Sequence, residues 1–444
     1  MTSAALTRQL AAFVTDPAAP EIPSAARAII RSGFIDTIAT MIAGIDEPVT
    51  RIVRDYVRNK RGGAAEASVL FSDERASAAD AALINGTAAH ALDYDDVALA
   101  GHPSTVLVPA ILAEGEALGA SGEAALRAYL IGYEVWAELI GRERDTHHTK
   151  GWHPTGVFGT IAAAAACAHL RGLDRERTTC ALAIAASFAA GLTANFGTMT
   201  KPLHAGRAAS NGIEAVRFAQ AGITAAADAL EHAGGFLAAF SPAGNVDRER
   251  DAVPLGKRLA ILESGLSIKK YPMCYATHRV IDGVLDLARQ HGVAAAEVDR
   301  VDATIGKAQA GMLRNHDPVT GLEAKFSLEF AIAAALVAGK VGLGQLNDAF
   351  VNEPSIKDLM RKVNIAQSDT RCPIEPFFAL TDRVVLRMKD GRMLDSGAVR
   401  FARGNAQMPL DDDALRAKFS DCLASAREID AVAFIPDGAE PGAS

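Results

Sequence analysis

Alanine-rich apolar segments fill the first half of this chain, and they restrict the folds that it can adopt. Between Ser3 and about Gln220 alanine recurs densely, and alanine is the residue that most favours an α-helix. Two segments, GTIAAAAACAHL and CALAIAASFAAGL, are apolar on every side, as expected of fully buried helices. Their small side chains allow close packing. The pattern predicts a body of tightly packed helices.

Three further segments fix where individual helices begin and end. SAARAIIRSGFIDTIATMIAG has an apolar face and predicts a helix that ends at Gly44. AADAALINGTAAHAL predicts a second helix, and STVLVPAILAEGEALGA a third with Ser104 or Thr105 as its N-cap. The stretch HALDYDDVALAGHPST, residues 90–105, is therefore expected to connect two helices.

The sequence pattern changes near residue 265, from alanine-rich helical segments to a mixture of strand and helix patterns. EVDRVDATIG alternates and is β-branched, which predicts a strand. DRVVLRMKDGRMLDSGAV predicts two strands around a turn at Asp390-Gly391. LSIKKYPMCYATHRVIDGVLDLARQ predicts a proline-interrupted segment followed by a helix, and LDDDALRAKFSDCLASA a helix after Gly404. The mixture predicts a separate α+β domain.

The overall composition excludes several classes of partner. The net charge is −8 without a run of like charge, so nucleic acid is not an expected partner. The N-terminal residues lack the apolar core of a signal peptide, and IAAAAACAHL is too short to span a bilayer, so no membrane association is expected. Five scattered cysteines favour a reducing compartment, and the cytoplasm is the expected location.

The connection at residues 90–105 is unusually dense in groups that transfer protons. It holds three acids between two histidines: His90, Asp93, Asp95, Asp96 and His102. A single aspartate in such a loop is more often an N-cap or a solvated residue. Four other stretches are also rich in catalytic residue types. They supply His147, His148, Lys150 and His153; Lys201, His204 and Arg207; Lys269, Lys270, Tyr271, Tyr275, His278 and Arg279; and Lys325 and Ser327.

Neither a metal nor an organic cofactor is expected. HHxxxxH resembles a metal-binding pattern, but no set of three ligands has helical spacing, and HExxH and CxxC are absent. No GxGxxG, P-loop or GxSxG motif is present, which argues against dinucleotides, ATP and serine-hydrolase chemistry. Lysines and histidines with one acidic patch suit a small substrate with several carboxylates. The cations would stabilise developing negative charge, while Asp or His exchanges protons.

Five motifs in this order carry a resemblance to a known family: HALDYDD with GHPS, GWHPTG, TKPLHAGRAASNG, IKKYP with ATH, and EAKFSLEF. They resemble the MmgE/PrpD family, which includes 2-methylcitrate dehydratase, cis-aconitate decarboxylase and iminodisuccinate epimerase. The resemblance covers residues 5 to 425. It implies a mostly α fold, with a helical domain over residues 1–264 and 405–444 and an α+β lid domain over residues 265–404. It also implies a homodimer without metal or organic cofactor.

The resemblance implies a site in the cleft between the domains. It assigns catalytic roles to Asp93, His102, His153 and Lys201 and substrate binding to Lys269, with His278 close by; we add Arg279, His148 and His204 to the substrate-binding group. In our first hypothesis Asp93 or His102 exchanges the proton on carbon, and His153 assists the leaving hydroxyl. Lysines 201 and 269, with Arg279, hold carboxylates. His90, Asp95 and Asp96 are expected to cap and shape the loop.

Three departures from the family pattern leave the reaction open. Val97 stands where the decarboxylase branch has Thr, and His148 and Phe330 stand where many members have Tyr. The first hypothesis is a cofactor-independent lyase that dehydrates a 2-methylcitrate-like acid. The alternatives are a cis-aconitate-type decarboxylase, an isomerase or epimerase of a dicarboxylate such as iminodisuccinate, and an inactive carboxylate-binding homologue.

Overall fold

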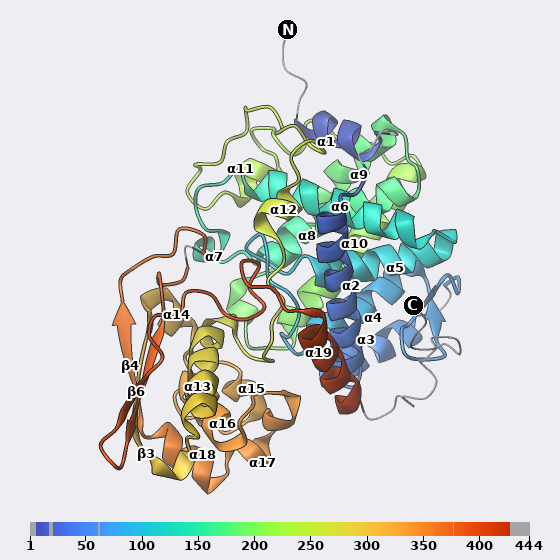
Figure 1. The fold of residues 1–444 in the computed structure, drawn as a ribbon. Coiled ribbons are helices and arrows are strands. Elements are labelled where there is room, and N and C mark those ends of the chain that lie inside the picture. Colours follow the sequence, from blue (N-terminus) through green and yellow to red (C-terminus); the bar gives the residue numbers. More distant parts are fainter. Residues whose placement is uncertain (1–5, 17–20, 61–62, 376, 427–444) are drawn as a thin grey trace, which may run out of the picture.

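The chain forms a large helical part and a smaller part that contains a sheet (Figure 1). The computed structural model describes residues 6–16, 21–60, 63–375 and 377–426. One apolar core draws on residues 6–266 and a second on residues 271–394. The predicted fold class is confirmed. The domain boundary at residue 265 stays a prediction, and residues 1–5 and 427–444 of the predicted helical domain lie outside the described ranges.

The helices of the large part follow the alanine-rich pattern. The helix predicted over residues 24–44 has those bounds in the structure. A two-stranded hairpin, β1 (Ala67–Ser68) with β2 (Arg75–Ala76), interrupts the series. The helices are α1 (Leu6–Val14), α2 (Ser24–Gly44), α3 (Pro48–Arg58), α4 (Ala78–His90), α5 (Ser104–Leu118), α6 (Gly122–Ile140), α7 (His147–Lys150), α8 (Pro154–Leu170), α9 (Arg175–Phe188), α10 (Thr200–Gln220), α11 (Phe236–Phe240) and α12 (Ala260–Ser264).

Two glycines allow α4 and α10 to pack in direct backbone contact. A Cβ on Gly206 would lie 2.3 Å from the carbonyl oxygen of Leu83, and one on Gly86 would lie 2.9 Å from the Cα of Gly206. Neither position therefore accepts a larger side chain without moving a helix. The contact lies near the C-terminus of α4 and the N-terminus of α10. It brings His90 and Lys201 to the same end of the helical part.

The predicted cap of α5 is wrong. The helix begins at Ser104, but Pro103 holds the cap position and no side chain caps it. The Ser104 hydroxyl instead hydrogen-bonds to the Asp96 carboxylate and lies 2.6 Å from the hydroxyl of Tyr129. A partner distant in sequence has replaced the local cap that Ser104 was expected to form.

The smaller part contains a four-stranded sheet in the order β4-β3-β5-β6. Strand β3 pairs parallel with β4 and antiparallel with β5, and β5 and β6 form the predicted hairpin with Gly391 at a φ of 89°. Strand β4 was not predicted. The elements are α13 (His278–His291), β3 (Val298–Gly306), α14 (Lys307–Met312), α15 (Gly321–Ala324), α16 (Leu328–Ala338), α17 (Asp348–Val351), α18 (Pro354–Met360), β4 (Val363–Ser368), β5 (Arg383–Met388), β6 (Met393–Asp395) and α19 (Asp412–Ser425).

Helix α13 covers one face of this sheet, whereas α19 lies outside the smaller part (Figure 1). A Cβ on Gly283 of α13 would lie 2.9 Å from Val384 of β5, so the helix packs closely on the strand. Helix α19 returns to the large part and packs against α2. The two parts are thus joined by the segment before α13 and by the segment that leads to α19.

No single helix among the described residues is both long and apolar enough to cross a membrane. The pair α2 and α3 meets the length and composition criteria only when taken together, across a bend of 85°.

Candidate active site

Three helix N-termini meet beside the C-terminus of α4, where the two parts of the molecule join. His102 precedes α5 by two residues, His153 is the N-cap of α8, and Lys201 is the second residue of α10. The ring of His90, the last residue of α4, lies 4.4 Å from that of His102 and 6.1 Å from that of His153, centroid to centroid. Because a helix N-terminus carries a partial positive charge, the arrangement favours an anion.

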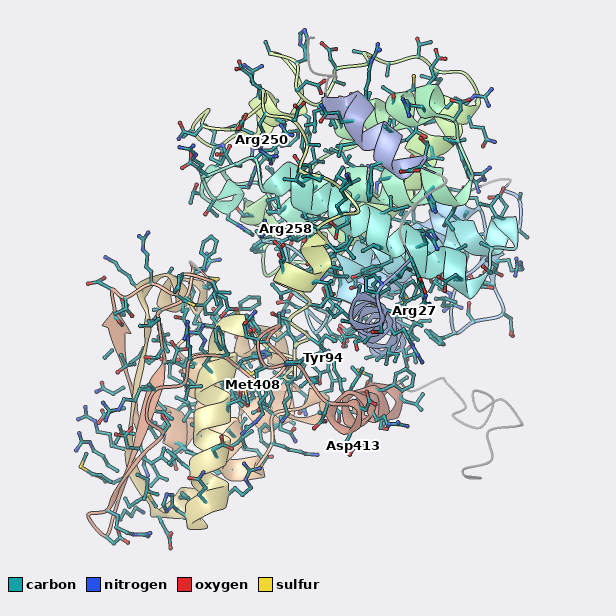
Figure 2. All side chains as sticks on the ribbon, turned by 45° about the horizontal axis from the view of Figure 1, so that its top comes forward. Arg27, Tyr94, Arg250, Arg258, Met408 and Asp413 are labelled. Atoms are coloured by element: carbon teal, nitrogen blue, oxygen red, sulfur yellow. The ribbon has the colours of Figure 1, made fainter. Side chains whose placement is uncertain are left out.

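The connection after α4 is fixed by three buried lysines that bind consecutive backbone carbonyls. Lys325 donates to the carbonyl of residue 92 at 3.0 Å, Lys269 to that of Asp93 at 2.6 Å and Lys418 to that of Tyr94 at 2.7 Å. All three lysines come from sequence positions after residue 265. Figure 2 shows Tyr94 at the junction of the two parts. The part of the chain after residue 265 therefore sets the shape of this loop.

Asp93 is held in a conformation that non-glycine residues rarely adopt. Its φ is 53°, in the left-handed region, which is unfavourable for a residue with a Cβ. The same residue carries the carboxylate at the centre of the cluster. Backbone strain of this kind persists only where surrounding contacts impose it, and it is concentrated at functional sites. The lysine contacts to the carbonyls on either side supply that constraint.

The Asp93 carboxylate binds two ammonium groups. Its Oδ1 lies 2.6 Å from Nζ of Lys201 and 3.0 Å from Nζ of Lys269. Burial favours the neutral acid, but the two lysine charges outweigh it and hold the pKa of Asp93 well below its usual range. The side chain keeps 15% of its surface exposed. A permanently ionised carboxylate is a weak base, so Asp93 is better suited to hold the lysines than to take a proton.

Asp95 lies between two imidazoles whose Nδ1 atoms both face oxygen acceptors. Its Oδ1 lies 2.7 Å from Nδ1 of His90, and its Oδ2 lies 2.8 Å from Nδ1 of His102. The hydrogen bond of His102 Nδ1 goes to the backbone oxygen of Asp96, also at 2.8 Å. Burial opposes the charge of Asp95, but the imidazoles hold its pKa well below the usual range. Because both Nδ1 atoms face acceptors, both Nε2 atoms are free for other contacts; that of His102 lies 4.0 Å from Asp93 Oδ1.

The pKa of Asp96 is shifted in the opposite direction from that of the adjacent Asp95. Burial raises its pKa well above the usual range, and the neighbouring acids Asp36 and Asp95 raise it further. It binds the backbone N–H of Ser104 at 3.3 Å as well as the hydroxyl. Asp96 therefore anchors the start of α5 through Ser104.

The remaining histidines form a neutral wall. Burial, with the charge of Lys201, lowers the pKa of His90 to about 4 and that of His153 well below its usual range. His153 Nδ1 lies 3.1 Å from His204 Nδ1, so one of the two rings donates to the other. Burial also lowers the pKa of His148 to about 4, and its Nδ1 has no partner among the described residues.

Two comparisons with known proteins bear on this site. The model of the MmgE/PrpD N-terminal domain matches residues 8–249, and that of the C-terminal domain matches residues 271–433. The chain belongs to the MmgE/PrpD family. A cis-aconitate decarboxylase from Mus musculus is 31% identical over 353 residues, covering 76% of this chain and 70% of the mouse protein. One from Homo sapiens is 29% identical over 400 residues (87% and 81%), and one from Aspergillus terreus 24% over 390 residues (82% and 79%).

The structure brings most of the residues predicted from the family motifs into this cluster. His278 lies beside it: its ring packs on those of Tyr271 and Tyr275, and its Nε2 is 3.3 Å from the Met273 carbonyl oxygen. The predicted residues that interact with one another or share ring contacts here are Asp93, His102, His148, His153, Lys201, His204 and Lys269.

Arg279 is directed elsewhere. Its guanidinium donates to Glu375 at 2.6 Å and to the carbonyl of Ala379 at 2.8 Å, and it is 2% exposed. These bonds tie α13 to the loop before β5. A guanidinium that is 2% exposed and bound to these oxygens is not accessible to a substrate carboxylate, so its predicted binding role has no support in this arrangement.

The three departures from the family pattern have different surroundings. Phe330 is fully buried in the apolar core of the smaller part, and its ring centroid lies 6.3 Å from that of Phe350. Val97 forms an isolated bridge with Ser267, and both of its backbone groups are used. His148 reaches the site, since its ring packs on Phe196, the ring over which Lys201 lies.

Ligand atoms of His90, His102 and His153 lie within 4.8 Å of one another, close enough to be drawn around a metal ion. Carboxylate-oriented imidazoles are common at such sites. Here, however, burial lowers the pKa of both His90 and His153 and the charge of Lys201 lowers it further, and the positive potential of that lysine also disfavours a cation. The expectation that the enzyme needs no metal stays a prediction.

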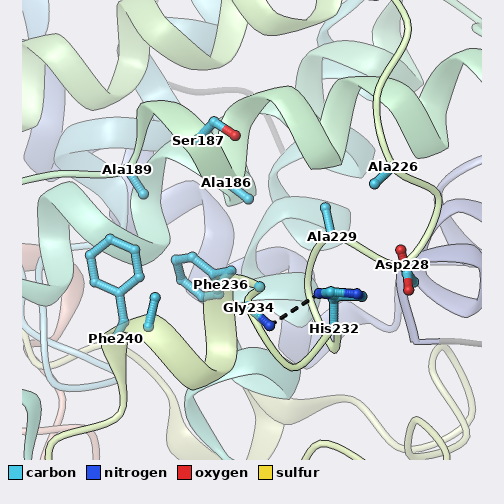
Figure 3. A pocket seen from close by; sticks show the side chains of 12 residues that line it. Ala186, Ser187, Ala189, Ala226, Asp228, Ala229, His232, Gly234, Phe236 and Phe240 are labelled. Atoms are coloured by element: carbon cyan, nitrogen blue, oxygen red, sulfur yellow. Dashed lines mark hydrogen bonds between the residues drawn. The ribbon is translucent and has the colours of Figure 1, made fainter.

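The cluster lies apart from a cavity of about 470 Å³ beside α9 and α11 (Figure 3). His232 accepts a hydrogen bond from the backbone of Gly234 there, and Phe240 packs on Trp152. None of the cluster residues lines this cavity.

Proposed function

We propose that this protein is a cofactor-independent decarboxylase of a small unsaturated polycarboxylate, with cis-aconitate as the first substrate to test. One observation carries the proposal. Two lysines bind the partly exposed carboxylate of Asp93, and the N-termini of three helices lie around it. The names of the relatives favour decarboxylation over the dehydration that we placed first from the sequence.

The lysines supply the electrostatic requirement of decarboxylation. When the C–C bond breaks and CO2 leaves, its electron pair shifts across the double bond toward a remaining carboxylate. Each ammonium has three donors, and Lys201 uses one on Asp93, so two remain for the substrate. Positive charges placed where negative charge develops stabilise the transition state.

A proton must then be added to carbon, and we assign that step to His102. Its Nε2 lies 4.0 Å from Asp93 Oδ1, on the side where the lysines would hold the substrate. The Asp95 carboxylate lies 2.8 Å from Nδ1, so a negative charge stands beside the ring that delivers the proton. His153 and His148 would hydrogen-bond to substrate carboxylates as neutral rings.

The low pKa of His153 disfavours the dehydratase hypothesis. Dehydration needs an acid to protonate the leaving hydroxyl, and we predicted His153 for that role. Burial, with the charge of Lys201, holds the pKa of His153 well below its usual range, so near neutral pH its ring is the neutral imidazole, which is a far weaker acid than an imidazolium. Decarboxylation of an unsaturated acid has no leaving hydroxyl and makes no such demand.

The test is a panel of cis-aconitate, 2-methylcitrate, citrate and iminodisuccinate, followed by NMR in deuterated buffer. We expect CO2 release from cis-aconitate and one deuterium on carbon in the product. Loss of water from 2-methylcitrate would instead support the dehydratase hypothesis. Deuterium uptake into a substrate without loss of CO2 or water would support the epimerase hypothesis. Binding without any turnover would support the inactive homologue. The homodimer and the cytoplasmic location stay predictions.

A further inference from the structure

A second cavity, of about 530 Å³, lies between the two parts of the molecule. One side is formed by the connection from α6 into α7, and the other by the start of α14 and the segment after β4, which Figure 1 places across from α7. Three cations from these segments line it, namely Arg144, Lys307 and Arg371. We call this space the outer cavity.

Sheet register explains why two of these cations meet. Strands β3 and β4 run parallel, and their last residues, Gly306 and Ser368, are direct partners. Because the two strands run in the same direction, the residues that follow them leave the sheet at the same end. Lys307 and Arg371 therefore stand on one wall, and Arg144 faces them from the helical part.

The cations of the outer cavity have no counter-ion. Within the described ranges, Arg144, Lys307 and Arg371 form no ion pair, although most arginines of this chain do. Asp369 is the single acidic residue among those that line the cavity. Four hydroxyls accompany them, from Thr146, Thr149, Ser368 and Thr370. On a chain of net charge −8, such a surplus of positive charge creates a local attraction for anions.

A row of aromatic rings links the outer cavity to the candidate active site. Phe377 lines the cavity and packs on the ring of His148 at 5.8 Å. His148 in turn packs on Phe196 at 6.2 Å, and Nζ of Lys201 lies 5.4 Å from the Phe196 ring. His148, with its unpartnered Nδ1, thus stands between the unpaired cations and the inner lysines.

We propose that the outer cavity is a second anion-binding site, which captures the polycarboxylate substrate before it reaches Asp93, Lys201 and Lys269. The identity of the ligand as substrate rests on the proposed function. The exposed cations act over several ångströms and raise the local concentration of a di- or tri-anion. Their contribution appears in substrate capture, not in the chemical step.

The test compares two triple variants that remove the same charge. Arg144→Gln/Lys307→Gln/Arg371→Gln alters the outer cavity. Arg8→Gln/Lys389→Gln/Arg416→Gln alters exposed cations elsewhere. At low ionic strength we expect kcat/KM of the first to fall about fivefold and kcat to stay unchanged. The difference should vanish near 0.5 M salt, where screening acts within a few ångströms. If both variants lose the same kcat/KM, the proposal is overturned.

A binding measurement separates this proposal from the proposed function. Tricarballylate, an unreactive tricarboxylate, is titrated into the Lys201→Met protein and followed by broadening of the ligand NMR signals. We expect weak, salt-sensitive binding that disappears when the three outer substitutions are added. If this binding persists in the combined variant, the outer cavity is not the site. If it disappears while wild-type protein turns over none of the acids, the outer site stands and the proposed function fails.

Discussion

The inner cluster and the outer cavity both concentrate positive charge, but they do so in opposite ways. In the inner cluster each lysine is buried and bound to a carboxylate or a carbonyl, as Lys269 is to Asp93. In the outer cavity the cations are exposed and have no counter-ion among the described residues. Buried pairs are weakly screened by salt and depend on geometry, whereas exposed charges act at a distance and are screened readily.

This difference shows that the inner lysines act by holding the loop and the Asp93 carboxylate in a defined geometry. Its lysines fix a strained loop and leave a few donors for a ligand, so single substitutions there should have large effects. The outer cavity contributes only the electrostatic attraction of its exposed cations for an anionic substrate. The effects of substitutions there should therefore be small and dependent on salt. The four predictions that follow test this comparison.

The largest effect is expected from Lys201→Met. Loss of one ammonium from the site of developing charge should lower kcat about 100-fold to 1,000-fold. Asp93 keeps Lys269, so the melting temperature should change little. Lys60→Met is the control, because Lys60 forms an equally short pair with Asp80 at 2.5 Å on the surface. Equal kcat in the two variants would exclude a catalytic role for Lys201.

Lys418→Met tests whether the loop must be held from the C-terminal helix. The ammonium binds the Tyr94 carbonyl and pairs with buried Asp36 at 2.5 Å. We expect the free energy of unfolding to fall by about 3 kcal/mol, because a buried carboxylate loses its partner. We also expect kcat to fall about tenfold, as expected when catalytic groups shift slightly.

The double variant Lys418→Met/Asp36→Asn separates these two effects. Removing both charges should restore most of the stability but not kcat, since the Tyr94 carbonyl still lacks its donor. Arg416→Met, on an exposed position of the same helix, is the control for helix α19. Full recovery of kcat in the double variant would mean that Lys418 serves stability alone.

The buried histidines predict a dependence of stability on pH. Burial lowers the pKa of His278 to about 3 and that of His90 to about 4. The unfolded chain binds protons near pH 6.5, whereas the folded one does not. The free energy of unfolding should therefore fall as the pH drops from 6.5 toward 4, by up to about 1.4 kcal/mol per unit for each histidine.

Asp36 acts in the opposite sense, because burial raises its pKa to about 6, so the test compares slopes between variants. His278→Asn should show a shallower slope than wild type in denaturation series between pH 7 and pH 5. His291→Asn, at an exposed position, should match wild type. Equal slopes in all three proteins would contradict a neutral, buried His278.

The smallest effect is expected from salt on the wild-type enzyme. Raising ionic strength from about 0.05 M to about 0.5 M should lower kcat/KM about fivefold through the exposed cations. The inner pairs are buried, so kcat should stay within about twofold. A parallel loss in both constants would show that the inner cluster is as open to screening as the outer cavity.

Much of this architecture could be predicted from local patterns. Apolar periodicity and glycine placed α2 at residues 24–44, and Asp390-Gly391 located the β5–β6 hairpin. The family motifs named Asp93, His102 and Lys201, which the fold brings together. Local signals sufficed because helix periodicity, turn chemistry and short motifs are properties of neighbouring residues.

Other features could not be read in this way. Strand β4 has no clear alternation, and its pairing with β3 makes it a strand. The motif stretch EAKFSLEF contained Lys325, but nothing distinguished its role, and Lys418 looks like any charged residue of an amphipathic helix. Both bind carbonyls more than 230 residues away in sequence. Arg279 sits next to His278, yet its partner is Glu375.

The sequence by itself determined the helical body, the α+β part, the family and the set of residues that carry protons and charge. The tertiary structure alone decided which of them work together: which lysines bind Asp93, which histidines stay neutral and which cations remain unpaired. The physical reason is that charge state and pairing depend on burial and distance. Those are set by contacts between helix ends that lie far apart along the chain.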